Sequence, residues 1–143
     1  MQISSPSFKN NESIPKKFTC LEKDMNPELV FENIPKEAKT LALILDDPDA
    51  PGGTFVHWIM FNIPVIEKIK ENSAEGIEGI NSAGQTGYIG PCPPSGTHYY
   101  FFKLYALDSS LDLNKGCTKK DLEKAMQEHI LAKTEIIGLF SKS

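Results

Sequence analysis

The first residues able to do chemistry together lie between Asp46 and Trp58. The chain reads Asp46-Asp47-Pro48-Asp49-Ala50-Pro51-Gly52-Gly53 and then runs into Phe55-Val56-His57-Trp58. Each proline keeps the residue before it extended, so the side chains of Asp47 and Asp49 are expected to point the same way. The two glycines permit a chain reversal, which returns His57, at the start of the next strand, to the same end of the sheet as these aspartates. Carboxylates beside an imidazole suit polar-ligand binding or proton transfer, although Asp-Pro-Asp is also ordinary turn chemistry.

A second candidate is the loop from Gly84 to Tyr100, which contains four glycines and three prolines. Such a loop presents backbone N–H groups to an anion and loses little entropy on binding. Its glycine spacing does not match a dinucleotide fingerprint, and no strand–helix unit surrounds it. At the start of the next strand, His98 and Tyr100 share a face, and Tyr99 points the other way. The alternative is a rigid surface loop with no ligand.

The elements that must position these residues are mostly strands. Ten prolines and ten glycines punctuate the chain, a pattern of short segments typical of an antiparallel β-sandwich or barrel. The run Leu41–Leu45 is continuously apolar, as in a strand buried on both faces. One principal helix is predicted over 118–132, capped by Thr118 and carrying an apolar stripe that extends to His129 and Ile130. The predicted strands are Ile3–Phe8, Lys16–Cys20, Glu28–Phe31, Thr40–Asp46, His57–Ile63, His98–Ala106 and a closing Ile136–Phe140.

Length and charge further restrict the domain organisation, partners and location of the protein. The 143 residues fit a single domain, 1–143, and show no linker or repeat. The net charge of −4 offers no basic surplus, so we expect no nucleic-acid partner. The longest aliphatic run is far shorter than the roughly 20 residues of a membrane helix, and no secretory signal opens the chain. We therefore expect a cytoplasmic protein without integral membrane contact.

The three cysteines are Cys20, Cys92 and Cys117, which are odd in number and widely spaced. No Cys-x-x-Cys pair occurs, so neither a disulfide scaffold nor a structural zinc site is indicated. We expect all three thiols to be reduced. Cys92 is the candidate reactive thiol, because His98 is the one nearby basic group that would lower its pKa.

Two long motifs, in order, carry a family resemblance. Asp-Pro-Asp-Ala-Pro followed by His-Trp, and Gly-Pro-Cys-Pro-Pro-Ser-Gly-Thr-His-x-Tyr followed by Tyr-Ala-Leu-Asp, resemble the phosphatidylethanolamine-binding protein (PEBP) family. The bacterial and archaeal branch, often called Raf-kinase-inhibitor-like, is the most similar. The resemblance extends from Ile14-Pro15 to His129-Ile130-Leu131-Ala132.

The resemblance implies a β-sandwich of PEBP type with a small anion pocket at one end. By the matched motifs, the ligand-binding residues are Asp47, Asp49, His57, Gly90, Pro91, His98 and Tyr100. Tyr99 stands where the family usually has Arg, and strand alternation turns it away from that pocket. Glu128 stands where the bacterial branch commonly has Gly.

The leading interpretation is a binding protein for a small phosphorylated or anionic ligand, not an enzyme. The resemblance implies phospholipid head-group or nucleotide binding and the inhibition of a kinase or protease, with peripheral head-group contact as the membrane link. Two alternatives stay open: a hydrolase using an Asp/His cleft, and a protein-interaction domain with a vestigial pocket. No catalytic nucleophile, metal or cofactor is predicted, since Ser95 has no elbow motif and the His spacing is not diagnostic of a metal site.

Overall fold

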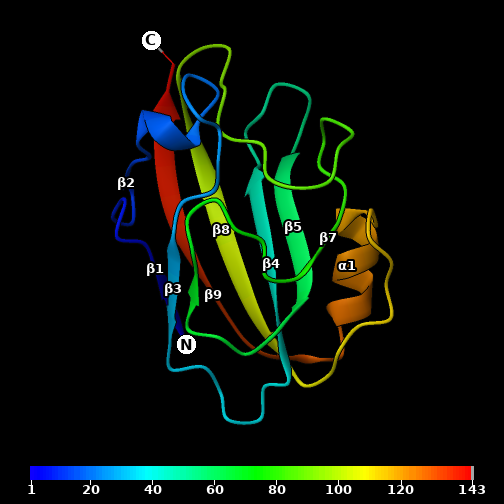
Figure 1. The fold of residues 1–143 in the computed structure, drawn as a ribbon. Coiled ribbons are helices and arrows are strands. Elements are labelled where there is room, and N and C mark those ends of the chain that lie inside the picture. Colours follow the sequence, from blue (N-terminus) through cyan, green and yellow to red (C-terminus); the bar gives the residue numbers. More distant parts are fainter. Residues whose placement is uncertain (143) are drawn as a thin grey trace.

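The chain folds into two facing β-sheets and one α-helix, and the computed structural model describes residues 1–142 (Figure 1). The large sheet has the order β2-β9-β8-β4-β5-β7, and the small sheet has the order β1-β3-β6. The paired strands are antiparallel except β2 and β9, which run parallel. The elements are β1 (Gln2–Ser4), β2 (Glu12–Ser13), the 3₁₀ helix η1 (Lys16–Phe18), β3 (Leu29–Glu32), β4 (Thr40–Asp47), β5 (Phe55–Ile63), β6 (Lys68–Ile69), β7 (Ile77–Glu78), β8 (Thr97–Leu107), α1 (Lys119–Met126) and β9 (Ile130–Ser141). The predicted mainly β fold with one principal helix near the C-terminus is confirmed.

Strand β4 lies inside the large sheet and is buried on both faces, as its apolar run predicts. Leu41, Leu43 and Leu45 belong to the core between the two sheets. Ala42 and Ile44 point the other way, into a second core that α1 covers. The strand alternation therefore divides one continuous apolar run between two cores.

The helix is shorter than predicted. It is well capped, since Thr118 accepts from the Asp121 amide and Asp121 accepts from the Thr118 amide, but it ends at Met126. Ile130 instead begins β9, which pairs with β8 along its length. The extension of the helix to residue 132 is wrong because sheet pairing outweighs the helical spacing of a few apolar side chains.

Two predicted strands near the N-terminus also differ. The segment Lys16–Cys20 forms η1 and a turn, with the Thr19 hydroxyl donating to the Lys16 carbonyl oxygen (2.8 Å). The strand predicted over Ile3–Phe8 stops at Ser4. The chain leaves the sheet as it approaches Pro6, which has no N–H to donate to a ladder.

No helix within residues 1–142 is both long and apolar enough to cross a membrane.

The prediction that all three thiols are reduced is wrong. Cys20 and Cys92 form a disulfide with a Cα–Cα distance of 5.5 Å across a sequence separation of 72 residues. The Cys20 amide also donates to the carbonyl oxygen of Pro91 (3.2 Å), so the fold itself brings the two segments together. Wide spacing in sequence does not report distance in space. Cys117 is free and half-buried.

A thiol titration checks the pairing. The denatured protein, unfolded without reductant, is expected to expose one reactive thiol, that of Cys117, and three after treatment with a dithiol. The variant Cys117→Ser is expected to expose none before reduction and two after. A count of three in unreduced wild-type protein would contradict the disulfide.

Candidate functional site

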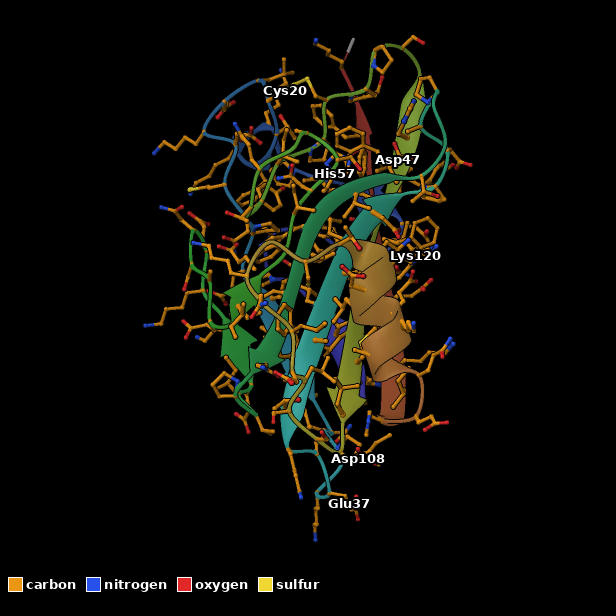
Figure 2. The ribbon with its side chains drawn as sticks, turned by 90° about the vertical axis from the view of Figure 1, so that its right-hand side faces the viewer. Cys20, Glu37, Asp47, His57, Asp108 and Lys120 are labelled. Carbon is orange, nitrogen blue, oxygen red and sulfur yellow. A yellow bond between two sulfur atoms is a disulfide. The ribbon has the colours of Figure 1, made fainter. Side chains whose placement is uncertain are left out.

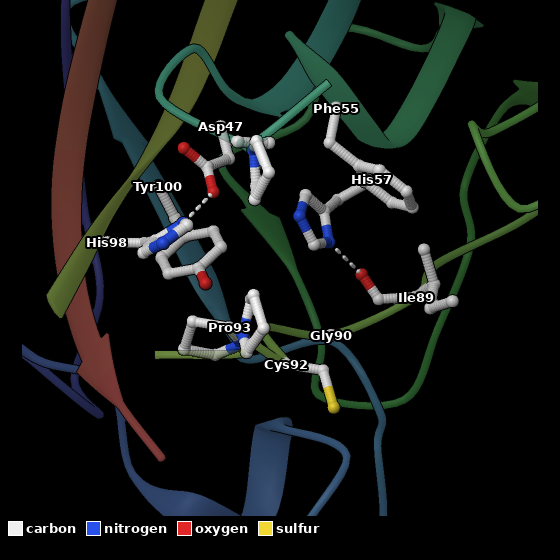
Figure 3. A pocket seen from close by; sticks show the side chains of 12 residues that line it. Asp47, Phe55, His57, Ile89, Gly90, Cys92, Pro93, His98 and Tyr100 are labelled. Atoms are coloured by element: carbon white, nitrogen blue, oxygen red, sulfur yellow. Dashed lines mark hydrogen bonds and ion pairs between the residues drawn. The ribbon is translucent and has the colours of Figure 1, made fainter. Parts of the chain in front are cut away.

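The candidate site is a cavity of about 210 Å³ at one end of the large sheet (Figure 3). It lies where β4 ends and β5 and β8 begin, beneath the glycine- and proline-rich loop that precedes β8. Because β4 is hydrogen-bonded to β5 on one side and to β8 on the other, Asp47 comes to lie between residues of both strands. The cavity is lined by Asp47, Ala50, Pro51, Phe55, His57, Ile89, Gly90, Cys92, Pro93, Pro94, His98 and Tyr100.

Asp47 and His98 form a hydrogen-bonded pair in the cavity wall. His98 Nδ1 lies 2.6 Å from Asp47 Oδ2, and the carboxylate is almost fully buried. The other carboxylate oxygen, Oδ1, accepts from the backbone amide of Asp49 (2.9 Å). Since an ionised carboxylate has no proton to donate, His98 Nδ1 is the donor, which leaves Nε2 as the free nitrogen of the ring. The hydrogen bond orients the imidazole and gives the buried carboxylate oxygen a partner.

His57 is held from the opposite side. Its Nδ1 donates to the carbonyl oxygen of Ile89 (2.7 Å), and the Ile89 amide donates to the carbonyl oxygen of His57 (3.0 Å). Burial lowers the pKa of His57 below its ordinary value of 6.5, although the Ile89 carbonyl and the negative charge of Asp47 oppose that shift. At neutral pH the ring is therefore mostly neutral, with the proton on Nδ1 and a lone pair on Nε2.

Tyr100 supplies a hydroxyl donor. Its ring is buried and lies edge-on to His57 at 5.2 Å between centroids. The hydroxyl makes no hydrogen bond within residues 1–142 and faces the cavity in Figure 3. Burial, reinforced by the negative charge of Asp47, raises the pKa of Tyr100 well above 10. The hydroxyl thus keeps its proton and is available to donate it in a hydrogen bond to a bound anion.

The loop packs tightly at Gly90. A Cβ atom at this position would lie 2.3 Å from the Phe18 carbonyl oxygen and 2.4 Å from Asp24 Oδ1, so only glycine fits. The Gly90 amide donates to Asp24 Oδ1 (2.7 Å), and the Ile89 amide is also used within the protein. Within residues 89–94 three positions are prolines without an N–H, so Cys92 has the one amide with no partner there. The loop offers an anion fewer backbone donors than its glycine content predicts.

Five of the seven predicted site residues line the cavity, namely Asp47, His57, Gly90, His98 and Tyr100. The other two do not: Asp49 is exposed, and Pro91 is buried behind the wall. Asp49 acts through its backbone amide, which orients Asp47. Tyr99 is 43% exposed and does not line the cavity, as strand alternation predicts.

Sequence reasoning missed the apolar part of the wall, formed by Ala50, Pro51, Phe55, Ile89, Pro93 and Pro94. Phe55 had a readable signal, because it lies two residues before His57 in the same strand and so shares its face. The centroid of the Phe55 ring lies 4.8 Å from the centroid of the His57 ring.

No group of three or more His, Cys, Asp or Glu residues suited to a metal ion occurs within residues 1–142.

The arrangement suits a small ligand that carries both signs of charge. Tyr100 donates to an anion, and the Nε2 atoms of His57 and His98 become donors when the rings are protonated. The Asp47 carboxylate attracts a cationic group. The apolar wall lowers the local dielectric constant, which strengthens each of these interactions.

Comparison with known proteins agrees with this architecture. The family model described as "Phosphatidylethanolamine-binding protein" matches residues 4–141. The UPF0098 protein of Methanothermobacter thermautotrophicus is 43% identical over 150 residues, covering 99% of each chain. The crystal structure of the Chlamydia trachomatis PEBP homologue CT736 superposes with a TM-score of 0.96 at 40% identity, covering 99% of this chain and 97% of that one. Escherichia coli YbcL shares the fold, with a TM-score of 0.92 at 24% identity over 99% and 98% of the two chains. Because the family model and a relative 43% identical both span nearly all of its length, the chain belongs to the phosphatidylethanolamine-binding protein family.

Proposed function

We propose that the protein binds a small phosphorylated zwitterion of the phosphoethanolamine type in this cavity and acts as a binding protein, without catalysis. The observation that carries the proposal is the convergence of one tyrosine hydroxyl, two oriented imidazoles and one buried carboxylate on a single small cavity. The hydroxyl and the protonated imidazoles hold the phosphate, and Asp47 attracts the ammonium group.

The size of the cavity supports a head group over a larger ligand. Its volume of about 210 Å³ lies below the range of roughly 300–1,000 Å³ typical of sites for drug-sized molecules. A ligand with so few atoms makes few contacts, so the expected dissociation constant lies between about micromolar and millimolar. Asp47 disfavours a phosphate dianion alone, and inorganic phosphate is expected to bind more weakly than phosphoethanolamine.

Family membership supports a regulatory role for this binding. We propose that the liganded pocket is part of a surface that inhibits a kinase or a protease, and that a lipid head group is one source of the phosphorylated group. We also propose a cytoplasmic location. The net charge of −4 offers a nucleic acid no electrostatic attraction.

The pH dependence of phosphoethanolamine binding tests the role of His57. The pKa of His57 is lowered in the free protein, and a bound phosphate favours the protonated ring. Affinity is therefore expected to increase as pH falls from 8 through 6.5, and to be lost as pH rises again. Calorimetry across this range measures the slope. The second ionisation of the phosphate, near pH 6, lies below this range, so the ligand is mostly a dianion throughout it.

Two variants make the pH test specific. His57→Gln keeps a polar side chain that does not titrate, so its affinity is expected to vary less with pH than that of the wild type. Tyr100→Phe removes one donor and is expected to weaken binding about tenfold at every pH, the effect of a lost hydrogen bond to a charged group. An unchanged slope in His57→Gln would contradict the role of that imidazole.

A hydrolase is the second candidate, and the Asp47–His98 pair is the observation that favours it. An imidazole oriented by a carboxylate is the arrangement of a general base. Ser95, the one serine of the loop, does not line the cavity. We therefore expect no turnover of generic ester, peptide or phosphomonoester substrates in assays at pH 6–8. Turnover that His98→Ala abolishes and the surface variant Tyr99→Ala retains would favour the hydrolase.

A further inference from the structure

The Cys20–Cys92 disulfide adjoins the candidate site. Cys92 lines the cavity, and Cys20 follows η1 in the segment that packs against the loop. Figure 2 shows Cys20 at the same end of the molecule as Asp47 and His57. We propose that this disulfide is a site of reversible thiol–disulfide exchange that controls the affinity of the pocket. The proposal rests on the proposed function for the identity of the ligand.

The disulfide is the last attachment between the loop that precedes β8 and the segment 16–24. Three hydrogen bonds attach the preceding residues to the segment 16–24: Tyr88 Oη to the Phe18 carbonyl oxygen (2.7 Å), the Gly90 amide to Asp24 Oδ1 (2.7 Å), and the Cys20 amide to the Pro91 carbonyl oxygen (3.2 Å). From Pro93 to Gly96 the described structure contains no hydrogen bond. Pro93 and Pro94 nevertheless form part of the cavity wall. Apart from the packing of the buried Pro93, their position therefore depends on Cys92 at one end and on β8 at the other.

Both cysteines are exposed, so a reductant in solution can reach the bond. Exposed disulfides are the labile and regulatory ones, and in reducing compartments disulfides are mostly transient and redox-sensing. Reduction by a dithiol proceeds by thiolate attack on one cysteine sulfur, which forms a mixed disulfide and releases the other cysteine. The second thiol of the reductant then displaces the first cysteine. Two electrons pass to the protein, which becomes Cys20–SH and Cys92–SH, and the reductant leaves as its own cyclic disulfide.

Reduction frees residues 92–96 to adopt arrangements in which Pro93 and Pro94 leave the wall. The apparent affinity of a site falls in proportion to the fraction of molecules that keep the binding arrangement. Asp47, His57, His98 and Tyr100 belong to strands and do not depend on the disulfide. Reduction is therefore expected to weaken binding and leave the fold and the polar groups of the site in place.

The test is phosphoethanolamine calorimetry on the full chain, oxidised and after reduction with dithiothreitol. We expect binding to the reduced protein to be about tenfold weaker and to recover on reoxidation. Cys20→Ser, which retains the cavity-lining Cys92, is expected to show the weak affinity under both conditions. The matched control is Cys117→Ser, whose affinity is expected to respond to dithiothreitol as the wild type does. Equal affinity of the oxidised and reduced proteins would overturn the proposal.

Amide hydrogen exchange separates a local effect from unfolding and does not require the ligand. Reduction is expected to speed exchange at Cys20 and Gly90, whose amides bond across the two segments, and to leave the amides of β4 and β8 protected. Loss of protection in β4 and β8 would show that the disulfide stabilises the whole fold, and it would overturn the proposal. If the oxidised protein fails to bind phosphoethanolamine, the proposed function fails. The exchange at Cys20 and Gly90 then decides separately whether the disulfide controls the loop.

Discussion

The burial of β4 is the constraint on which the rest of the structure depends. The strand is hydrogen-bonded to β5 and β8 at its two edges and is packed on both faces. Its register, and the face of the sheet to which each side chain points, therefore cannot change without exposing apolar side chains. Its last two residues are therefore aimed in opposite directions. Asp46 meets Lys103 (3.2 Å) and Lys119 (2.8 Å), and Asp47 meets His98 in the cavity.

A buried carboxylate at the end of such a strand needs partners, and the site follows from how Asp47 is satisfied. The Asp49 amide takes one oxygen and His98 takes the other, so the turn after β4 and the start of β8 are both held to the same group. His57 is oriented separately by the Ile89 carbonyl. The two imidazoles consequently have different environments: one is paired with a charge, and the other is desolvated with a lowered pKa. That difference gives the pocket a group whose protonation a bound phosphate can change.

The loop that completes the pocket is held by different means. The strands are specified by long ladders of hydrogen bonds, and the segment 88–94 is attached by a few single contacts, a glycine packed against backbone, and a disulfide. A wall built of prolines needs little ordering on binding, but it has few amides of its own to bond to the neighbouring chain. The covalent link compensates for that shortage at the point where the hydrogen bonds end.

The sequence by itself determined what depends on neighbours along the chain. The unbroken apolar run identified β4 as buried on both faces. Alternation placed His98 and Tyr100 on one face and turned Tyr99 outward, because side-chain direction in a strand repeats every two residues. The motifs identified the polar half of the cavity. Only the tertiary structure decided the pairing of Cys20 with Cys92, the exposure of the Asp49 side chain, the use of the Gly90 amide by Asp24 and the early end of α1. Each of these depends on which remote segment comes within bonding distance, and local spacing carries no information about that distance.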